Sequence, residues 1–201
     1  MTDTCVIQYA TGKCLEYLDL TKDIHQKFCK KHKYDYIVKT INNASNNLHV
    51  SWNKPLLIKE VCQKEYKKII WLDADTIWLG SSLFFESKKP FSCTFHFCPI
   101  NGGFHFNNGV ILINNNEYTK TKVNEWLTIP DDNHVWAEQW SFNKMIHKNP
   151  TSINILDHSW NSVEHSSDHK SSSPRIVAWH GRPDITLHEM KRYLLSQEIG
   201  G

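Results

Sequence analysis

The stretch Ile69-Ile70-Trp71-Leu72-Asp73-Ala74-Asp75 joins a run of large apolar residues to two carboxylates that stand two positions apart. Residues i and i+2 of a strand share one face, and an unpaired carboxylate on a buried face costs several kcal/mol. If the strand ends at Asp73, both acids turn toward a pocket, where a divalent cation and a phosphate offset their repulsion. The pattern predicts a strand-end metal site. Because Asp-x-Asp alone is common, the flanking sequence has to decide.

Apolar periodicity upstream of this stretch predicts alternating strands and helices. Strands are expected at residues 5–9, 36–38 and 69–72, and helices at about 15–32 and 54–66. This βαβαβ order predicts parallel strands, right-handed crossovers and a ligand site at the carboxyl ends of the strands, where Asp73 and Asp75 stand. The first half is therefore expected to be Rossmann-like.

The second half of the chain has a different pattern. Strands are expected at 91–97, 109–113, 153–156 and 176–180, and helices near 123–127, 138–147 and 185–197. A Gly-rich loop is predicted at 100–106, and a mobile Ser- and His-rich loop at 163–173. The side chains of the last helix expected to face inward are Leu187, Met190, Leu194 and Leu195. The expected fold class is α/β: one domain over 1–201, with a mixed, mainly parallel central sheet flanked by helices.

Bulk composition excludes several classes of protein. Of the 201 residues, 40% are hydrophobic and 22% are charged, which is typical of a globular chain, and no apolar run is long enough to span a bilayer. A formal net charge of +2 from scattered lysines gives no basic surface for nucleic acid. No secretory signal precedes the first strand, so a cytoplasmic location is expected.

The six cysteines and twelve histidines form no recognisable motif. The cysteines lie mostly in apolar segments without Cys-x-x-Cys spacing, so we interpret them as reduced core residues. The histidines are spread along the chain without zinc-binding spacing, so most are expected at the surface.

Four short segments of the second half place polar residues at the ends of apolar elements. They are Phe106–Asn114 (FNNGVILIN), Ala137–Asn143 (AEQWSFN), Ser159–Asn161 (SWN) and Ala178–Pro183 (AWHGRP). Each also has a purely structural explanation. Asn108-Gly109 suits a hairpin turn, Glu138 complements a helix dipole, and His180 is an ordinary strand-end residue. Taken alone, each segment leaves both interpretations open.

In their order along the chain, these motifs resemble the nucleotide-sugar glycosyltransferases of the GT-A fold. The strongest similarity is to two retaining families, the glycogenin-like family eight and the galactosyl/mannosyltransferase-like family thirty-four, whose signatures look like FNSGVMLI, DQxxLN, WN and HxxG. Family thirty-four is also similar at Tyr34-Asp35-Tyr36 and Trp52-Asn53-Lys54. The resemblance covers nearly the whole chain. It extends to capsid-glycosylating domains of large algal DNA viruses, which would place the protein in the host cytoplasm.

Three positions depart from the family-eight pattern. Glu138 stands where that family usually has Asp, and His180-Gly181 has a closer His-to-Gly spacing than HxxG. Arg182 stands in for the lysine that reaches the phosphates. These differences leave the donor and its phosphate contacts open.

The resemblance implies a divalent cation between the two phosphates of the donor. Asp75 and His180 would coordinate it directly, and Asp73 would contact both ribose and metal. A nitrogen ligand favours Mn²⁺ over Mg²⁺. The cation would act as a Lewis acid on the leaving diphosphate.

The phosphates themselves would contact residues around the two metal-binding motifs. Arg182 would add a fixed positive charge, and Ala74 and Gly181 are expected to border the donor. Lys54 is a second phosphate-binding candidate, with a solvated lysine at a helix start as the equal alternative.

The helix start at 138 is expected to bind the donor sugar. Glu138 would hydrogen-bond the sugar hydroxyls, Gln139 would face the anomeric carbon, and Asn108 would hold sugar or diphosphate. Retention classically needs a carboxylate nucleophile, and an amide is a poor one, so Gln139 favours departure and attack on the same face. Together with Asp75, Glu138 and Gln139 are the expected catalytic residues.

The remaining assignments rest on position. The base and ribose are expected over the end of the first strand, near Tyr9, Ala10, Thr11 and Tyr17. Trp160 and Asn161 are expected on the acceptor side, with a core role for Trp160 as the even alternative. Segment 163–173 would close as a lid that excludes water.

The sequence therefore predicts a metal-dependent retaining glycosyltransferase that moves a hexose-type sugar from a UDP-type donor to a glycan or glycoprotein. About 1–80 would form the nucleotide-binding half and about 81–201 the sugar- and acceptor-binding half. The alternative is a non-catalytic nucleotide-sugar-binding module. A two-metal phosphohydrolase is disfavoured because it needs more carboxylates than Asp73 and Asp75 supply.

Overall fold

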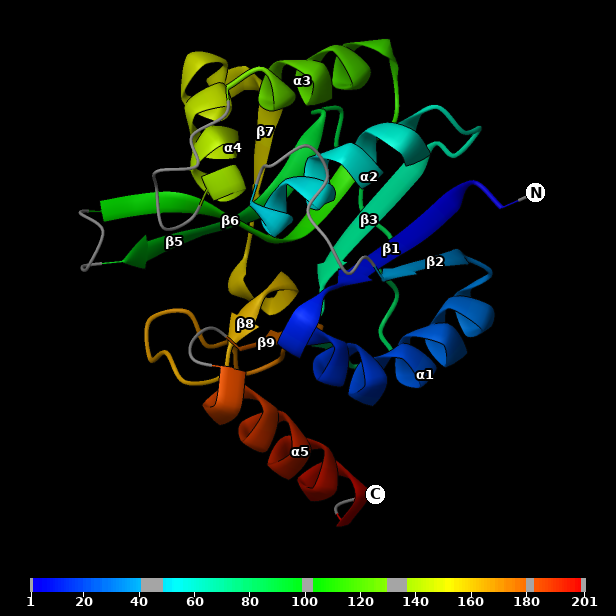
Figure 1. Ribbon diagram of the computed structural model, residues 1–201, viewed down its shortest axis with the longest axis vertical. Coiled ribbons are helices and arrows are strands. Elements are labelled where there is room, and N and C mark those ends of the chain that lie inside the picture. The colour runs from blue at the N-terminus through cyan, green and yellow to red at the C-terminus, as the bar shows by residue number, and fades with distance from the viewer. Residues whose placement is uncertain (1, 41–48, 99–102, 130–136, 180–182, 200–201) are drawn as a thin grey trace.

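The computed structural model describes residues 2–40, 49–98, 103–129, 137–179 and 183–199. A six-stranded sheet of order β2-β1-β3-β6-β5-β7 forms the centre of the molecule, with helices packed against it (Figure 1). Three strand pairs are parallel and two are antiparallel. The predicted mixed, mainly parallel α/β fold is confirmed.

The first half follows the predicted βαβαβ order. It comprises β1 (Thr4–Ala10), α1 (Leu15–His32), β2 (Asp35–Thr40), α2 (Asn53–Cys62) and β3 (Lys68–Asp73). Strand β1 pairs in parallel with both β2 and β3. The carboxyl ends of the three strands therefore meet at one edge of the sheet, as expected of this topology.

The second half adds antiparallel strands to the same sheet. It contains β5 (Phe91–Cys98), β6 (Gly103–Asn114), α3 (Glu117–Leu127), α4 (Ala137–Lys148) and β7 (Ile153–Leu156). The predicted Gly-rich loop at 100–106 is wrong from Gly103 onward, because β6 begins there and pairs with the end of β5. Asn108-Gly109 lies inside β6, so the hairpin-turn interpretation is also wrong.

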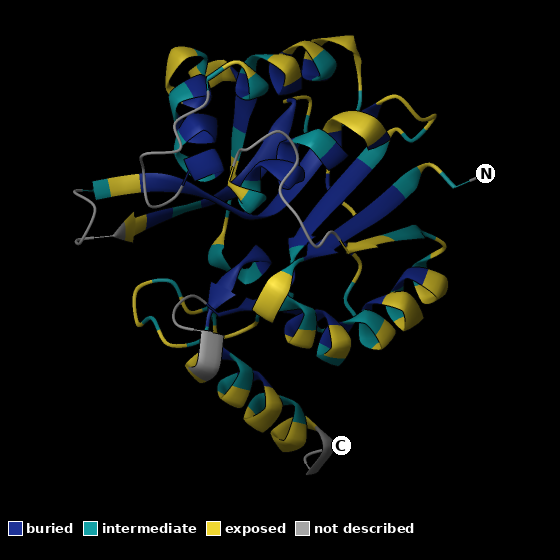
Figure 2. Cartoon of the chain, in the orientation of Figure 1, coloured by how far each residue is buried: buried dark blue, intermediate teal, exposed yellow. Residues whose placement is uncertain are grey.

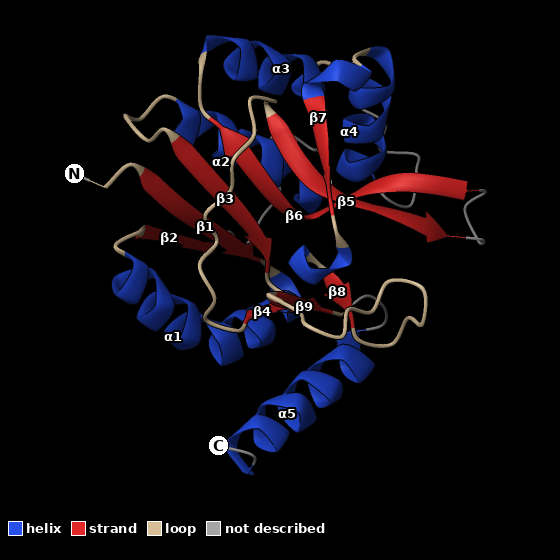
Figure 3. Cartoon of the chain, turned by 180° about the vertical axis from the view of Figure 1, so that it is seen from behind, coloured by secondary structure: helices blue, strands red, loops and turns tan. Residues whose placement is uncertain are grey.

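A second, three-stranded sheet of order β4-β9-β8 was not anticipated from the sequence. Its strands are β4 (Thr76–Trp78), β8 (Ser162–Val163) and β9 (Ile176–Ala178). Strand β9 confirms the strand predicted from residue 176, whereas β4 and β8 are too short to show a period. The last helix, α5 (Pro183–Ile199), packs near this sheet and extends away from the body (Figures 1 and 3). Met190 is buried there, but Leu195 is 59% exposed, which corrects its predicted inward position because one narrow stripe of the helix meets the fold.

Alternating side chains of the central strands fill two separate cores, one on each face of the sheet. Ile7, Trp71 and Ile111 lie in one core, and Val6 and Ile70 in the other. Figure 2 shows the middle strands of the sheet largely buried, whereas the edge strand β2 is partly exposed. The described cysteine side chains are free thiols, as expected, and Cys5, Cys29, Cys62 and Cys93 are buried. None of the described helices is long and apolar enough to cross a membrane.

Helix α4 is anchored to β6 through one buried side chain. Asn143 Oδ1 accepts from the Phe106 N–H (2.7 Å), and its Nδ2 donates to the Phe106 and Gln139 carbonyls (both 2.9 Å). Because these backbone groups are buried, losing their partner leaves them unsatisfied.

We expect Asn143→Ala to lower the free energy of unfolding by about 1–3 kcal/mol, because it leaves buried backbone groups without a hydrogen-bond partner. Urea denaturation followed by circular dichroism measures this loss. Lys148→Ala, an exposed change on the same helix, is the control and should stay within about 0.5 kcal/mol of wild type. Equal effects of the two substitutions would contradict the anchoring role.

Candidate functional site

Strand β3 ends at Asp73, as the pair of carboxylates in the sequence led us to expect. Thr76 Oγ1 donates to the Asp73 carbonyl (2.7 Å), and the chain turns between Asp73 and Asp75 into β4. The Trp179 N–H donates to the Asp75 carbonyl (3.1 Å), which brings the end of β9 beside this turn. Residues 180–182 follow directly but lie outside the described residues, so the roles of His180, Gly181 and Arg182 stay predictions.

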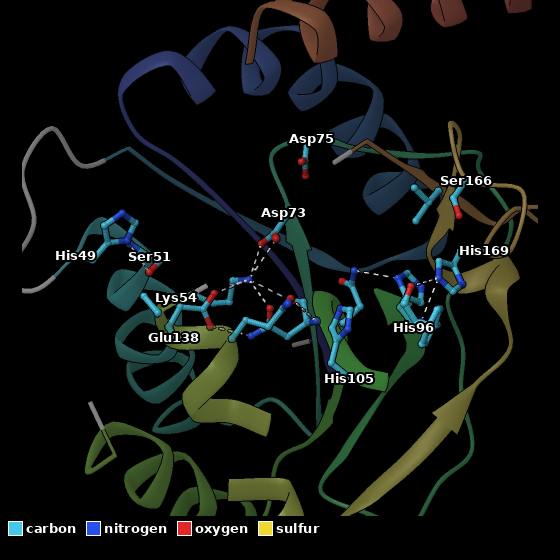
Figure 4. Close-up of a pocket in the computed structure, with 16 residues that line it drawn as sticks. His49, Ser51, Lys54, Asp73, Asp75, His96, His105, Glu138, Ser166 and His169 are labelled. Carbon is cyan, nitrogen blue, oxygen red and sulfur yellow. Dashed lines mark hydrogen bonds and ion pairs between the residues drawn. The ribbon is translucent and has the colours of Figure 1, made fainter. Parts of the chain in front are cut away.

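Lys54 is a buried cation, not a solvated one. It is 6% exposed, and its Nζ lies 3.0 Å from Asp73 Oδ1 and 3.1 Å from Glu138 Oε1 (Figure 4). The alternative of a solvated helix-start lysine is therefore wrong. Trp71 Nε1 donates to the same Asp73 oxygen (2.6 Å), so Asp73 is held from two sides.

Asn108 joins Lys54 to the start of α4. Lys54 Nζ donates to the Asn108 carbonyl (3.2 Å) and Oδ1 (3.1 Å), and Asn108 Nδ2 donates to Glu138 Oε2 (2.7 Å). The Asn108 N–H donates to Gln139 Oε1 (3.3 Å). The predicted phosphate-binding candidate on α2 and the predicted sugar-binding residues on β6 and α4 thus converge on the end of β3.

Gly109 permits this convergence because it has no side chain. A Cβ at this position would meet Asn107 Oδ1 at 3.1 Å and Asp73 Oδ2 at 3.3 Å. The missing side chain therefore lets the middle of β6 lie close to Asp73.

Two carboxyl groups of the site, those of Glu138 and Asp75, have pKa values above their usual range. Burial raises the pKa of Glu138 to about 7, against the opposing charge of Lys54. Burial and the nearby Asp73 charge also raise the pKa of Asp75. Burial lowers the pKa of Lys54, but Asp73 and Glu138 outweigh it, so the net shift is upward and Lys54 stays charged.

The site has the donor set and the charge imbalance that suit a divalent cation. Asp75 is half-buried and forms no ion pair within the described residues, while Lys54 is already shared between Asp73 and Glu138. A cation beside Asp75 would relieve the repulsion that raises its pKa, and carboxylate oxygens are the ligands that Mg²⁺ and Mn²⁺ prefer. The residues therefore fit the predicted metal.

Two cavities meet at the Asp73–Asp75 turn. The smaller, of about 220 Å³, is lined by the predicted nucleotide-contacting residues and by residues of the turn. Those predicted residues are Tyr9, Ala10, Thr11 and Tyr17. The larger, of about 460 Å³, is bordered by Asn108, Glu138 and Gln139. Lys54, Asp73, Asp75 and Glu138 line both cavities, so the structure brings the described site predictions together.

Trp160 and Asn161 are not where the acceptor-side prediction expected them. Trp160 is 7% exposed and packs in the core with residues such as Ile70 and Leu72, which favours its structural interpretation. Asn161 is fully buried, and its Nδ2 donates to Asn107 Oδ1 (2.9 Å) behind the cavity wall. From the predicted lid, Val163, Ser166 and His169 do line the larger cavity.

Sequence reasoning missed several residues that line the larger cavity. They include His49, Ser51, His96 and His105. His96 and His105 form a cross-strand pair between β5 and β6. The period of two in residues 91–97 could have placed His96 on one face, but the pairing with His105 needed the extended β6.

Comparison with known families decides the classification. A family model described as nucleotide-diphospho-sugar transferase matches residues 16–180. The chain belongs to this family. No curated protein sequence matches the transferase.

Several solved structures share the fold of the transferase. A glycosyltransferase involved in the glycosylation of the major capsid of PBCV-1 is 16% identical, with a TM-score of 0.75 over 94% of this chain and 100% of that one. The galactosyltransferase LgtC, with donor and acceptor sugar analogs, is 12% identical, with a TM-score of 0.64 over 94% of both chains. Mouse xyloside xylosyltransferase 1 is 14% identical, with a TM-score of 0.56 over 90% of this chain and 98% of that one. The GT-A fold expected from the sequence is confirmed.

The raised pKa of Glu138 predicts a pH-dependent stability of the metal-free transferase. The pKa is about 7 in the folded state against an ordinary value of 4.5, so folding favours the protonated form and this contribution to stability is lost as pH rises through 7. Between about pH 5 and pH 8, wild type should lose on the order of 3 kcal/mol relative to Glu138→Gln. Urea unfolding in EDTA at both pH values measures the difference.

Glu117→Gln is the matched control, since Glu117 pairs only with Lys120 at the surface. It should leave the pH dependence of wild type unchanged. If Glu138→Gln unfolds with the wild-type pH dependence, the assignment of this titration to Glu138 is wrong.

Proposed function

We propose that the transferase is a metal-dependent retaining enzyme that moves a hexose-type sugar from a UDP-type donor to a glycan or glycoprotein acceptor. The observation that carries the proposal is the Asp73–Asp75 turn, which borders both cavities and lies beside the backbone of Trp179. A diphosphate there would have the nucleotide cavity on one side and the sugar-binding residues on the other.

Residues of the smaller cavity support binding of a nucleoside. Tyr9 is 9% exposed, and its hydroxyl accepts from Asn53 Nδ2 (3.0 Å), which holds the ring at the cavity wall. Tyr17 comes from α1 and lines the same cavity. Two aromatic side chains and the short strand end at Ala10 and Thr11 form a surface for a base and ribose.

The predicted cation would be Mn²⁺ or Mg²⁺ held by Asp73, Asp75 and His180. When bound, it supplies a positive charge that stabilises the leaving diphosphate. Arg182 would add a second, fixed charge to the same phosphates. Lys54 would act as a positioning residue instead of a phosphate ligand, because its ammonium fixes the orientation of Asp73 and Glu138.

Glu138, Gln139 and Asn108 are placed to bind the sugar. Glu138 and Asn108 are buried, and both have their side chains fixed by hydrogen bonds at the border of the larger cavity. Gln139 is held through its Oε1 by the Asn108 N–H. An amide in this position is a poor nucleophile, which supports departure and attack on the same face of the sugar over a covalent intermediate.

The acceptor would enter the part of the larger cavity lined by His96, His105 and segment 163–169. This replaces the predicted acceptor role of Trp160 and Asn161. The capsid-glycosylating enzyme among the similar structures supports a glycoprotein acceptor, and the LgtC complex supports a sugar acceptor.

Replacing Asp75 tests the metal and the donor together. We expect Asp75→Ala to abolish Mn²⁺-dependent binding of UDP-sugars, because it removes the predicted direct metal ligand. Isothermal titration calorimetry with and without Mn²⁺ measures this. Asp19→Ala, at an exposed position of α1, is the control and should bind as wild type does. Undiminished donor binding by Asp75→Ala would count against the proposed site.

Turnover separates the enzyme from the alternative, a non-catalytic nucleotide-sugar-binding module. Incubation with a panel of nucleotide sugars and Mn²⁺ should release UDP from at least one of them, even without acceptor and at a slow rate. Loss of this release in Glu138→Gln and Asp75→Ala would link it to the site. Tight donor binding with no release from any sugar would favour the binding module.

A further inference from the structure

Three histidines from separate segments meet at the end of the larger cavity that lies away from Asp73. His96 comes from β5, His158 from the 3₁₀ turn His158–Trp160, and His169 from the loop between β8 and β9. Each offers one ring nitrogen, and the three nitrogens lie within 4.8 Å of one another. Figure 4 shows His96 and His169 facing each other across this end of the cavity.

His169 is held by backbone contacts that leave one nitrogen for a ligand. Its Nε2 lies 2.9 Å from the Phe97 carbonyl oxygen and 3.1 Å from the Phe97 nitrogen, so the same residue can serve either tautomer. Its own carbonyl accepts from the Val163 N–H (3.0 Å), which fixes the loop. With Nε2–H donated to a carbonyl, Nδ1 carries a lone pair, which is the usual arrangement of a metal-binding histidine.

Two ring nitrogens of this cluster are placed to accept a ligand. The Nδ1 atoms of His158 and His169 are buried and have no hydrogen-bond partner among the described residues. Buried polar atoms without partners call for an explanation, and a bound cation is one.

We propose that His96, His158 and His169 form a second metal site that binds a borderline transition-metal ion, Zn²⁺ above all. Imidazole nitrogen suits Zn²⁺, whereas the oxygen-rich Asp73–Asp75 turn suits Mn²⁺ or Mg²⁺. In tetrahedral zinc sites, bond lengths of about 2.0–2.1 Å place ligand nitrogens about 3.3 Å apart. The nitrogens therefore have to close by up to about 1.5 Å, and the stacked rings of His96 and His169 have to turn so that their lone pairs converge. A fourth ligand would be water or a group in the cavity.

Binding requires one proton rearrangement at His96. The Nδ1 atom of His96 lies 3.1 Å from Asn107 Nδ2. The Asn107 amide is oriented by two hydrogen bonds to its Oδ1, one donated by the Gly109 N–H and one by Asn161 Nδ2. Ligation through Nε2 needs the proton on Nδ1, so His96 must either leave its contact with Asn107 Nδ2 or have the Asn107 amide turned over at the cost of the two hydrogen bonds to Oδ1. Zinc uptake and the orientation of Asn107 are thus coupled.

A zinc ion here would tie the loop that carries His169 to β5 and to the turn at His158. Since His96 and His169 line the larger cavity, the ion would shape the region where the acceptor is expected. That consequence rests on the proposed function, but zinc binding itself does not.

The test titrates the full chain with Zn²⁺ in excess Mn²⁺ by isothermal titration calorimetry. We expect one Zn²⁺ per chain, and a loss of affinity of more than about tenfold in both His158→Ala and His169→Ala. His165→Ala is the matched control, because His165 is an exposed histidine of the same loop outside the cluster, and it should keep wild-type affinity. Asp75→Ala should also keep it, which separates this site from the proposed donor site.

Zinc K-edge absorption of the wild-type complex gives a readout that needs no variant. A shell of nitrogen ligands at about 2.0–2.1 Å is expected. Absence of Zn²⁺ binding, an all-oxygen shell, or equal losses in His165→Ala and His169→Ala would each overturn the proposal. Unfolding in EDTA confirms that the variants are folded before titration.

Discussion

The buried ammonium of Lys54 is the interaction on which the site depends. It lies within 3.1 Å of carboxylate oxygens from Asp73 and Glu138, and it also donates to Asn108. These contacts join α2, the end of β3, the middle of β6 and the start of α4. Removing one partner of a buried charge pair leaves the other uncompensated, so each of these elements is constrained by the other three.

The same constraint divides the site into a charged centre and two cavities. Lys54 shares its single positive charge between Asp73 and Glu138, whereas Asp75 forms no ion pair in the described part of the chain. The site therefore lacks positive charge where the donor diphosphate is proposed to lie. The end of the larger cavity away from Asp73 is bordered instead by the histidine cluster, whose nitrogens suit a different class of metal ion.

Much of the fold could be predicted because its signals are local. The apolar runs and helical periods of the first half correctly predicted its strands and helices, and parallel pairing follows from their order. The start of β6 at Gly103 and the small sheet were missed, since polar and Gly-rich segments become strands only through their partners. Leu195 was misplaced for a similar reason: its exposure depends on how α5 meets the fold.

By itself, the sequence determined the βαβαβ order, the break at Asp73 and the motifs that identify the family, because these depend on residues close together in the chain. Only the tertiary structure decided that Lys54 is buried, that Trp160 belongs to the core and that three histidines far apart in the sequence lie close together. Burial and the meeting of side chains from separate strands depend on sheet register and on packing across the fold. No single stretch of sequence carries that information.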